Sequence, residues 1–219
     1  MGRVCALKSV RIYFKKSDRM KFVSHLDMNR FMCRQLRLSK IPIWYTEGFN
    51  PHPYVTFLLP LSLGFESDYE IMDIRLTDDN YPFDEVKNNL SNVMPEYIEI
   101  FEVKEPVNKP GKIGYAKYQV KFKTFNDDLP VLLTKFLLNE SIITEKKGKK
   151  GNVKTIDLAP KIIDFSVDLV GNDLLLSITL PAGGADNINP TLLLSAYGKL
   201  PYYTVKKTMV YDTDMKKFE

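Results

Sequence analysis

The spacing of apolar and polar residues predicts regular elements along the first half of the chain. Residues 10–14 alternate between the two classes, and this period of two is typical of a half-buried strand. Between 28 and 36 the apolar residues are three and four apart, which predicts an amphipathic helix with Ser24 as its N-cap. The same two periods predict strands at 43–45, 55–63, 72–76 and 98–103, and a second helix at 83–94.

The second half repeats this succession. The predicted elements are a strand at 118–122, a helix at 129–137, a strand from 142, strands at 163–169 and 174–180, a helix at 190–197 and a strand at 205–211. Gly171-Asn172-Asp173 separates two alternating segments, so it predicts a hairpin turn. Asn189 followed by Pro190 is typical of a helix start.

Both halves therefore have the order strand, helix, strand, strand, helix, strand. This order predicts an α+β protein of two tandem ferredoxin-like (βαββαβ) units, each with its helices on one face of an antiparallel sheet. We place the first unit at 1–107, a linker rich in proline and glycine at 108–114, and the second unit at 115–219.

Composition excludes several classes of site. The 219 residues are 44% hydrophobic and 26% charged, which is ordinary for a globular protein. Two cysteines cannot form a disulfide framework or hold an iron–sulfur cluster alone, and two histidines do not give zinc-ligand spacing. No dinucleotide-binding or P-loop motif is present, so we predict no cofactor and no metal. With no signal peptide and no membrane-spanning segment, we expect a cytoplasmic protein.

The charge is distributed unevenly along the chain. Residues 1–60 hold 11 basic and 3 acidic side chains, whereas residues 61–108 hold 3 basic and 12 acidic ones. Residues 109–219 hold 17 basic and 12 acidic side chains, and the total is +4. Such segregation is typical of an interaction surface, although oppositely charged stretches can also pair within the fold.

Three segments carry a family resemblance. They are RIYFKK at 11–16, the long run at 21–70 and IDLAPKI at 156–162. The core of the long run is F-x-S-H-L-D at 22–27 followed by E-G-F-N-P-x-P at 47–53. Together they resemble the radical-SAM-linked family, a bacterial domain without an established activity. The resemblance implies a partner, a cobalamin-binding radical SAM protein that is fused to the domain or encoded nearby.

A looser similarity is to the repeat-processing RNA endonucleases of CRISPR systems. Those proteins resemble the predicted fold because they also use tandem ferredoxin-like units. The resemblance implies a catalytic histidine near the first helix and a glycine-rich RNA-binding loop in the second unit. His25 and the pair Gly183-Gly184 are the corresponding residues here.

Ser24, His25 and Asp27 surround the start of the first predicted helix. The helix dipole disfavours a positively charged imidazole there, so a neutral His25 is a candidate general base toward an RNA 2′-hydroxyl. The alternative is structural: Ser24 and Asp27 cap the helix, and His25 only makes a hydrogen bond.

Arg30, Arg34 and Arg37 are spaced to lie on one face of this helix. They are candidates for contacting RNA phosphates or a partner protein. Alternatively they form a solvated face that pairs with Asp27 and other acids.

The segment 47–53 is too distinctive for a simple turn. Phe49 and His52 are candidates to stack on a base, and Asn50 to read a base edge. Glu47 and His52 are also candidates for an acid/base pair with His25. The alternative is a rigid crossover that packs Phe49 into the core.

Two charged runs have possible roles. Lys146, Lys147, Lys149 and Lys150 form a basic segment at a predicted hairpin tip that can attract an RNA backbone. The acidic run at 66–73 is interpreted as a solvated strand edge in preference to a metal site.

These observations favour a non-catalytic accessory protein that partners a radical SAM enzyme in RNA or ribosome-related modification. The alternative is a metal-independent endoribonuclease or an RNA-binding protein. RNA and the radical SAM protein are the expected partners, and no membrane is expected.

Overall fold

The computed structural model describes residues 7–123, 125–147, 153–184 and 186–219. The chain divides into two compact units. Unit 1 holds the residues up to Pro110 together with Glu219, and unit 2 holds Gly111–Phe218. Both units combine helices with antiparallel strands, so the predicted α+β class is confirmed. The division into tandem ferredoxin-like units with a linker at 108–114 stays a prediction.

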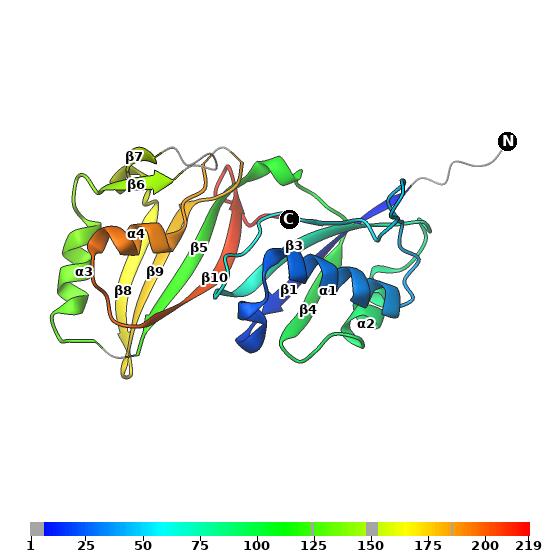
Figure 1. Cartoon of the computed structure of the whole chain (residues 1–219), viewed down its shortest axis with the longest axis horizontal. Coiled ribbons are helices and arrows are strands. Elements are labelled where there is room, and N and C mark those ends of the chain that lie inside the picture. The colour runs from blue at the N-terminus through cyan, green and yellow to red at the C-terminus, as the bar shows by residue number, and fades with distance from the viewer. Residues whose placement is uncertain (1–6, 124, 148–152, 185) are drawn as a thin grey trace. The chain divides into compact units, whose positions relative to one another are not determined.

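The described residues of unit 1 form two α-helices and four strands (Figure 1). Its elements are β1 (Lys8–Lys16), the 3₁₀ turn η1 (Asp18–Phe22), α1 (His25–Leu38), β2 (Val55–Phe57), β3 (Glu66–Leu76), α2 (Phe83–Ser91) and β4 (Ile98–Lys104). The strands are ordered β4-β1-β3 with β2 added to β3, and every pairing is antiparallel. Helices α1 and α2 lie on the same face of this sheet.

The core of unit 1 lies between that face and the helices. Val10 and Ile12 of β1 pack in one buried cluster with Met32 and Leu36 of α1, and residues of β3, β4 and α2 complete it. Because alternate residues of a strand point to opposite faces, Arg11 projects from the face that the helices leave uncovered. The period of two therefore sorts β1 into an apolar face and a polar face.

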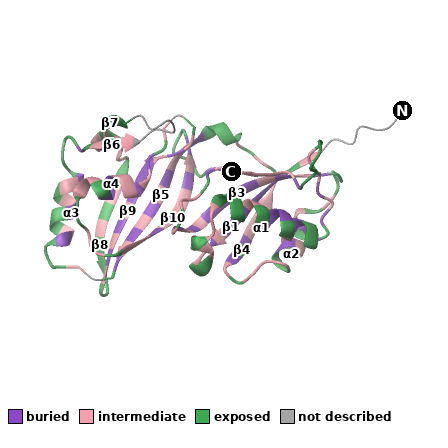
Figure 2. Ribbon diagram, viewed as in Figure 1, coloured by how far each residue is buried: buried purple, intermediate pink, exposed green. Residues whose placement is uncertain are grey.

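Unit 2 has a related arrangement with an additional hairpin. Its elements are β5 (Ile113–Phe122), α3 (Leu129–Leu137), β6 (Ile143–Lys147), β7 (Val153–Asp157), the 3₁₀ turn η3 (Ala159–Lys161), β8 (Asp164–Val170), β9 (Asp173–Pro181), α4 (Pro190–Tyr197) and β10 (Tyr203–Asp212). A further 3₁₀ turn, η2 (Pro110–Lys112), spans the boundary between the units. The main strands are ordered β10-β5-β9-β8, and β6 and β7 pair separately. Figure 2 shows the alternating burial along β5 and β9.

The local signals of unit 2 are confirmed in detail. The Asn189 side chain accepts a hydrogen bond from the Thr191 backbone N–H (2.9 Å), as expected of an N-cap. Gly171, in the predicted β8–β9 turn, has a φ of +60°, a conformation that glycine adopts without steric cost. Turn and cap residues therefore predict these boundaries well.

Two strand predictions are wrong in extent, and one strand is missing from the prediction. Residues 43–45 form only isolated bridges, from Ile43 to Leu76 and from Tyr45 to Pro53. Strand β2 ends at Phe57, short of Pro60, which has no N–H for a ladder. Strand β7 was not predicted, because its polar and exposed residues lack an alternating pattern. Among the described residues, no helix has both the length and the apolar content to cross a bilayer.

Candidate nucleic-acid interface

The N-terminus of α1 is capped as predicted. The Ser24 hydroxyl accepts a hydrogen bond from the Asp27 backbone N–H (3.2 Å) and donates one to Asp27 Oδ2 (2.7 Å). Both polar side chains therefore take part in capping the N-terminus of α1. This geometry supports the structural interpretation of Ser24 and Asp27, and leaves His25 and the arginines as the available groups.

The three arginines of α1 form an exposed basic face. Arg30, Arg34 and Arg37 are all exposed. Arg30 lies 3.4 Å from Asp27 Oδ1, and both side chains are largely solvated, so this ion pair contributes little. Within the described ranges, no ion pair is recorded for Arg34 or Arg37. The alternative that these arginines pair with acids therefore holds for Arg30 alone, and the charges of Arg34 and Arg37 are available to a partner.

The segment from Trp44 to Tyr54 folds into a hairpin-like loop. The Tyr54 N–H donates to the Trp44 carbonyl (3.0 Å), and the Thr46 N–H donates to the His52 carbonyl (2.9 Å). The His52 imidazole Nδ1 lies 3.2 Å from the Thr46 hydroxyl and 3.0 Å from the Asn50 carbonyl. These contacts hold His52 within its own loop.

Phe49 lies at the tip of this loop and is fully exposed. The interpretation that packs this ring into the core is therefore wrong. Gly48, which precedes Phe49, has a φ of +125°, a conformation that favours glycine and turns the chain. Glu47 and Asn50 are also exposed. An exposed aromatic ring on a hydrogen-bonded loop is a preformed stacking surface.

Contacts of Cys33 join this loop to the basic face. The Cys33 sulfur lies 3.7 Å from the carbonyl oxygen of Pro53, at the end of the loop. Burial raises the pKa of the Cys33 thiol, and the nearby positive charge of Arg37 partly opposes this shift. Arg30 and Arg37 are three residues before and four after Cys33, so they lie on the helix face that meets the loop. The end of the loop at Pro53 thus contacts α1 at Cys33, about one turn of helix from Arg30 and from Arg37.

His25 lies at a different point, at the mouth of a small hollow. Its exposed ring packs edge-on against Phe57, with 5.3 Å between ring centroids. The hollow is also lined by Lys16 and Glu70, and both are buried. In the described part of the chain, no contact joins His25 to Glu47 or to His52. The predicted acid/base group is therefore not assembled.

The hollow beside His25 has a volume of only about 10 Å³. This is roughly the space that one water molecule requires. A ribose and its phosphate are too large to enter this hollow.

Lys16 and Glu70 were not predicted as candidates. Lys16 is an even number of residues from Val10 and Ile12 along β1, so the alternation places it on the same face. Glu70 pairs with Phe14, another residue of that face, in the β1–β3 register. The period of two therefore places both on the buried face, and this signal was present in the sequence. The interpretation of 66–73 as a solvated edge is wrong for Glu70.

One side chain of the predicted basic segment of unit 2 is described, that of Lys146. Lys146 on β6 donates a hydrogen bond to the Asn187 carbonyl (2.8 Å). Lys149 and Lys150 lie outside the described residues, as does the side chain of Lys147.

The fold and site together define an α+β protein with an exposed basic and aromatic surface on unit 1. The chain belongs to the bacterial family described as "Uncharacterized protein conserved in bacteria (DUF2344)", whose model matches residues 9–190. No curated protein has a significantly similar sequence.

Two solved structures show distant similarity. One is a chain of a Cbf5-Nop10-Gar1 complex, with a TM-score of 0.47 and 11% identity over 92% of this chain and 48% of that chain. The other is a candidate glycine cleavage system transcriptional repressor, with a TM-score of 0.27 and 11% identity over 92% and 98% of the two chains. TM-scores below 0.5 do not establish a shared fold. The chain spans about half the length of the Cbf5-Nop10-Gar1 chain that it matches.

Proposed function

We propose that this protein is a non-catalytic accessory protein that binds single-stranded RNA on unit 1 and partners a cobalamin-binding radical SAM enzyme. One observation carries the RNA-binding part: α1 has a row of exposed arginines, and the loop that contacts this helix at Cys33 presents a fully exposed Phe49. The radical SAM partner is supported by the sequence resemblance alone.

The chemistry of the surface matches unpaired RNA. Guanidinium groups bind phosphate oxygens with two parallel hydrogen bonds, and Arg34 and Arg37 are available for this. An exposed aromatic ring stacks on a base of any sequence, and Phe49 supplies it. Bases in a duplex are already stacked on each other, so the arrangement favours a single strand or a loop.

RNA binding is tested by fluorescence anisotropy with a labelled single-stranded oligoribonucleotide of about 12 nucleotides. Phe49→Ala should weaken binding by about 5- to 100-fold, because one stacked base is lost. Arg37→Gln should weaken binding and reduce the slope of log affinity against log salt by about 1. Arg19→Gln, an exposed charge on η1, is the matched control and should bind normally. Equal affinity of all four proteins would contradict the proposal.

The partner is tested separately, by co-expression of the chain with the radical SAM protein encoded beside it. The proposal expects the two proteins to co-purify at low salt. Absence of association under these conditions would remove the accessory role, but would leave RNA binding standing.

A second candidate is a metal-independent endoribonuclease, favoured by the exposed imidazole of His25 at the start of α1, the helix that also carries exposed arginines. RNA is incubated with the native protein and with His25→Ala, both in the presence of EDTA. Cleavage that depends on His25 would support this candidate, whereas equal cleavage or none would eliminate it. His25 is exposed, so the substitution should not affect folding.

We also propose that both units are ferredoxin-like. In unit 1 the strand β3 lies between β1 and β2, which follow each other across α1. The strand order of unit 2, β10-β5-β9-β8, matches that of unit 1 when the β6–β7 hairpin is regarded as an insertion. An experimental structure with a different strand order in either unit would contradict this assignment.

A further inference from the structure

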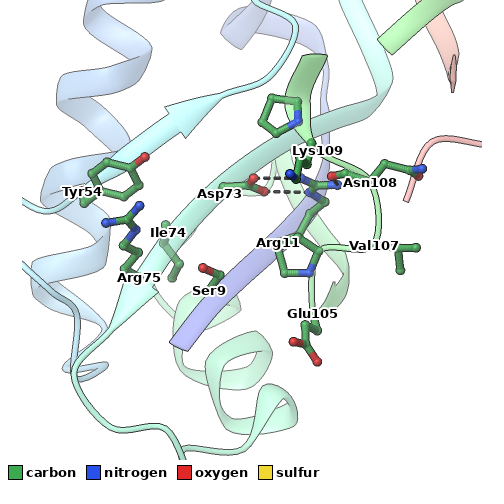
Figure 3. A pocket seen from close by; sticks show the side chains of 12 residues that line it. Ser9, Arg11, Tyr54, Asp73, Ile74, Arg75, Glu105, Val107, Asn108 and Lys109 are labelled. Carbon is green, nitrogen blue, oxygen red and sulfur yellow. Dashed lines mark hydrogen bonds and ion pairs between the residues drawn. The ribbon is translucent and has the colours of Figure 1, made fainter. Parts of the chain in front are cut away.

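Unit 1 has a second candidate site, on the sheet face that carries no helix (Figure 3). It is a pocket of about 470 Å³ above the paired ends of β1 and β3, walled on one side by the segment 105–110. Ser9 faces Arg75 across the two strands, and Arg11 faces Asp73 two residue pairs further along. Residues two apart share a face, so all four side chains line the pocket.

Arg11 and Asp73 form one wall of the pocket and pair with each other. Arg11 Nε and Nη2 each donate to an Asp73 carboxylate oxygen at 2.8 Å, and Nη1 donates to the Asn108 carbonyl at 2.9 Å. The guanidinium is fully buried. This pair therefore neutralises itself, and it positions segment 105–110 against the sheet.

Arg75 is held differently, by aromatic rings. Its guanidinium carbon lies 4.6 Å from the ring centroid of Tyr54 and 5.5 Å from that of Trp44. Stacking fixes the plane of a guanidinium but leaves the N–H groups at its edge free to donate. Among the described residues, no hydrogen bond or ion pair of these groups is recorded. Arg75 is thus a stacked donor at the edge of the pocket, where Figure 3 shows its guanidinium beside the Tyr54 ring.

The remaining charge of the lining is positive. Once Arg11 and Asp73 are paired, the other charged residues of the lining are two bases, Arg75 and Lys109, and one acid, Glu105. Ser9 places a hydroxyl opposite Arg75 in the strand register. A phosphate monoester carries nearly two negative charges and accepts several hydrogen bonds, so it suits two cations and a hydroxyl. The pocket volume is within the range that small-molecule ligands occupy.

We propose that this pocket binds a phosphate monoester, carried either by a free nucleotide or by the phosphorylated end of an RNA strand. This site is distinct from the α1–loop surface. Trp44 and Tyr54 nevertheless form the base of the loop whose tip is Phe49, so a strand bound on the loop is near the pocket. The site does not depend on RNA binding, since a free nucleotide can fill it.

The test is titration of the full chain with adenosine and uridine 5′-monophosphates and with the two nucleosides. Trp44 is the only tryptophan and contacts Arg75, so its fluorescence reports occupancy. The monophosphates should bind about tenfold or more tightly than the nucleosides. Arg75→Gln should remove this difference, Arg75→Lys and Lys109→Gln should reduce it, and Arg19→Gln should leave it intact.

The source of the phosphate is resolved with matched 5′-phosphorylated and 5′-hydroxyl oligoribonucleotides. If the phosphorylated strand binds more tightly and Arg75→Gln cancels the gain, the pocket receives an RNA end. If monophosphates bind but the two strands do not differ, the ligand is a free nucleotide. No saturable binding of either monophosphate below about 10 mM, with no difference between the strands, would overturn the proposal. Phe49→Ala tests the loop surface independently, and Lys109→Gln keeps the test valid if Arg75 variants fail to fold.

Discussion

Removal of Asp73 should be one of the most destabilising single changes in unit 1. The Arg11 side chain has no exposed surface, and Asp73 is only 17% exposed. Burial by itself lowers the pKa of Arg11, but the hydrogen bonds and charge of Asp73 outweigh it, so the pKa is raised overall. The carboxylate therefore stabilises a charge that water cannot reach.

The expected loss of unfolding free energy depends on which charged group the substitution leaves without its partner. Asp73→Ala leaves a buried guanidinium without its carboxylate and should cost about 3–5 kcal/mol of unfolding free energy. Arg11→Met leaves a partly exposed carboxylate and the Asn108 carbonyl, so it should cost about 1–3 kcal/mol. The double variant Arg11→Met with Asp73→Leu replaces both charges by apolar groups and should cost less than Asp73→Ala alone.

Urea denaturation followed by Trp44 fluorescence measures these differences, because the single tryptophan lies in unit 1 and reports that unit. The diagnostic result is the order of the three variants. If Asp73→Ala costs less than about 1 kcal/mol, or if the double variant is the least stable, then water solvates the guanidinium and the buried-pair reasoning is refuted.

Three further predictions concern packing and pH. Leu36→Ala should cost about 2–5 kcal/mol in the same assay, because this side chain is fully buried between α1 and the sheet. Phe49→Ala should change stability by less than about 0.5 kcal/mol, and a larger loss would show that the ring packs against the protein. Hydrogen bonds from the Ile142 and Ala159 backbone N–H groups hold the pKa of Asp157 below its ordinary value. Asp157 thus stabilises the fold above its unfolded-state pKa, and this contribution is lost as the pH falls through the folded-state pKa. In thermal denaturation, the deficit of Asp157→Asn should shrink below about pH 4, and a constant deficit would contradict the assignment.

The buried faces of unit 1 could be predicted because each depends on local spacing. Val10 and Ile12 show a period of two, and Met32 and Leu36 show a helical period, so their burial follows from neighbours in sequence. The pocket could not be predicted in this way. Arg75 reaches Ser9 only through the β1–β3 register, and it reaches Trp44 through a loop that forms no regular strand. Such contacts join residues far apart in the chain, and no local period encodes them.

The segment IDLAPKI illustrates how a distinctive motif can be structural. Its Asp157 accepts hydrogen bonds from the Ile142 and Ala159 N–H groups and from the Ser141 hydroxyl, and these tie β7 to the start of β6. Pro160 follows in the 3₁₀ turn η3, where a fixed φ is favourable. The residue types of this segment are explained by the turn that they build, so the segment needs no ligand.

The loop motif E-G-F-N-P-x-P, in contrast, contains one residue that the structure of the loop does not explain. Gly48 supplies a positive φ, His52 bonds within the loop, and Pro53 is buried against Cys33. Each of these residues shapes or anchors the loop. Phe49 does neither, because its ring is fully exposed at the tip, where burial contributes nothing to stability. The proposed RNA ligand would give this exposed ring a role, because an unpaired base can stack on it.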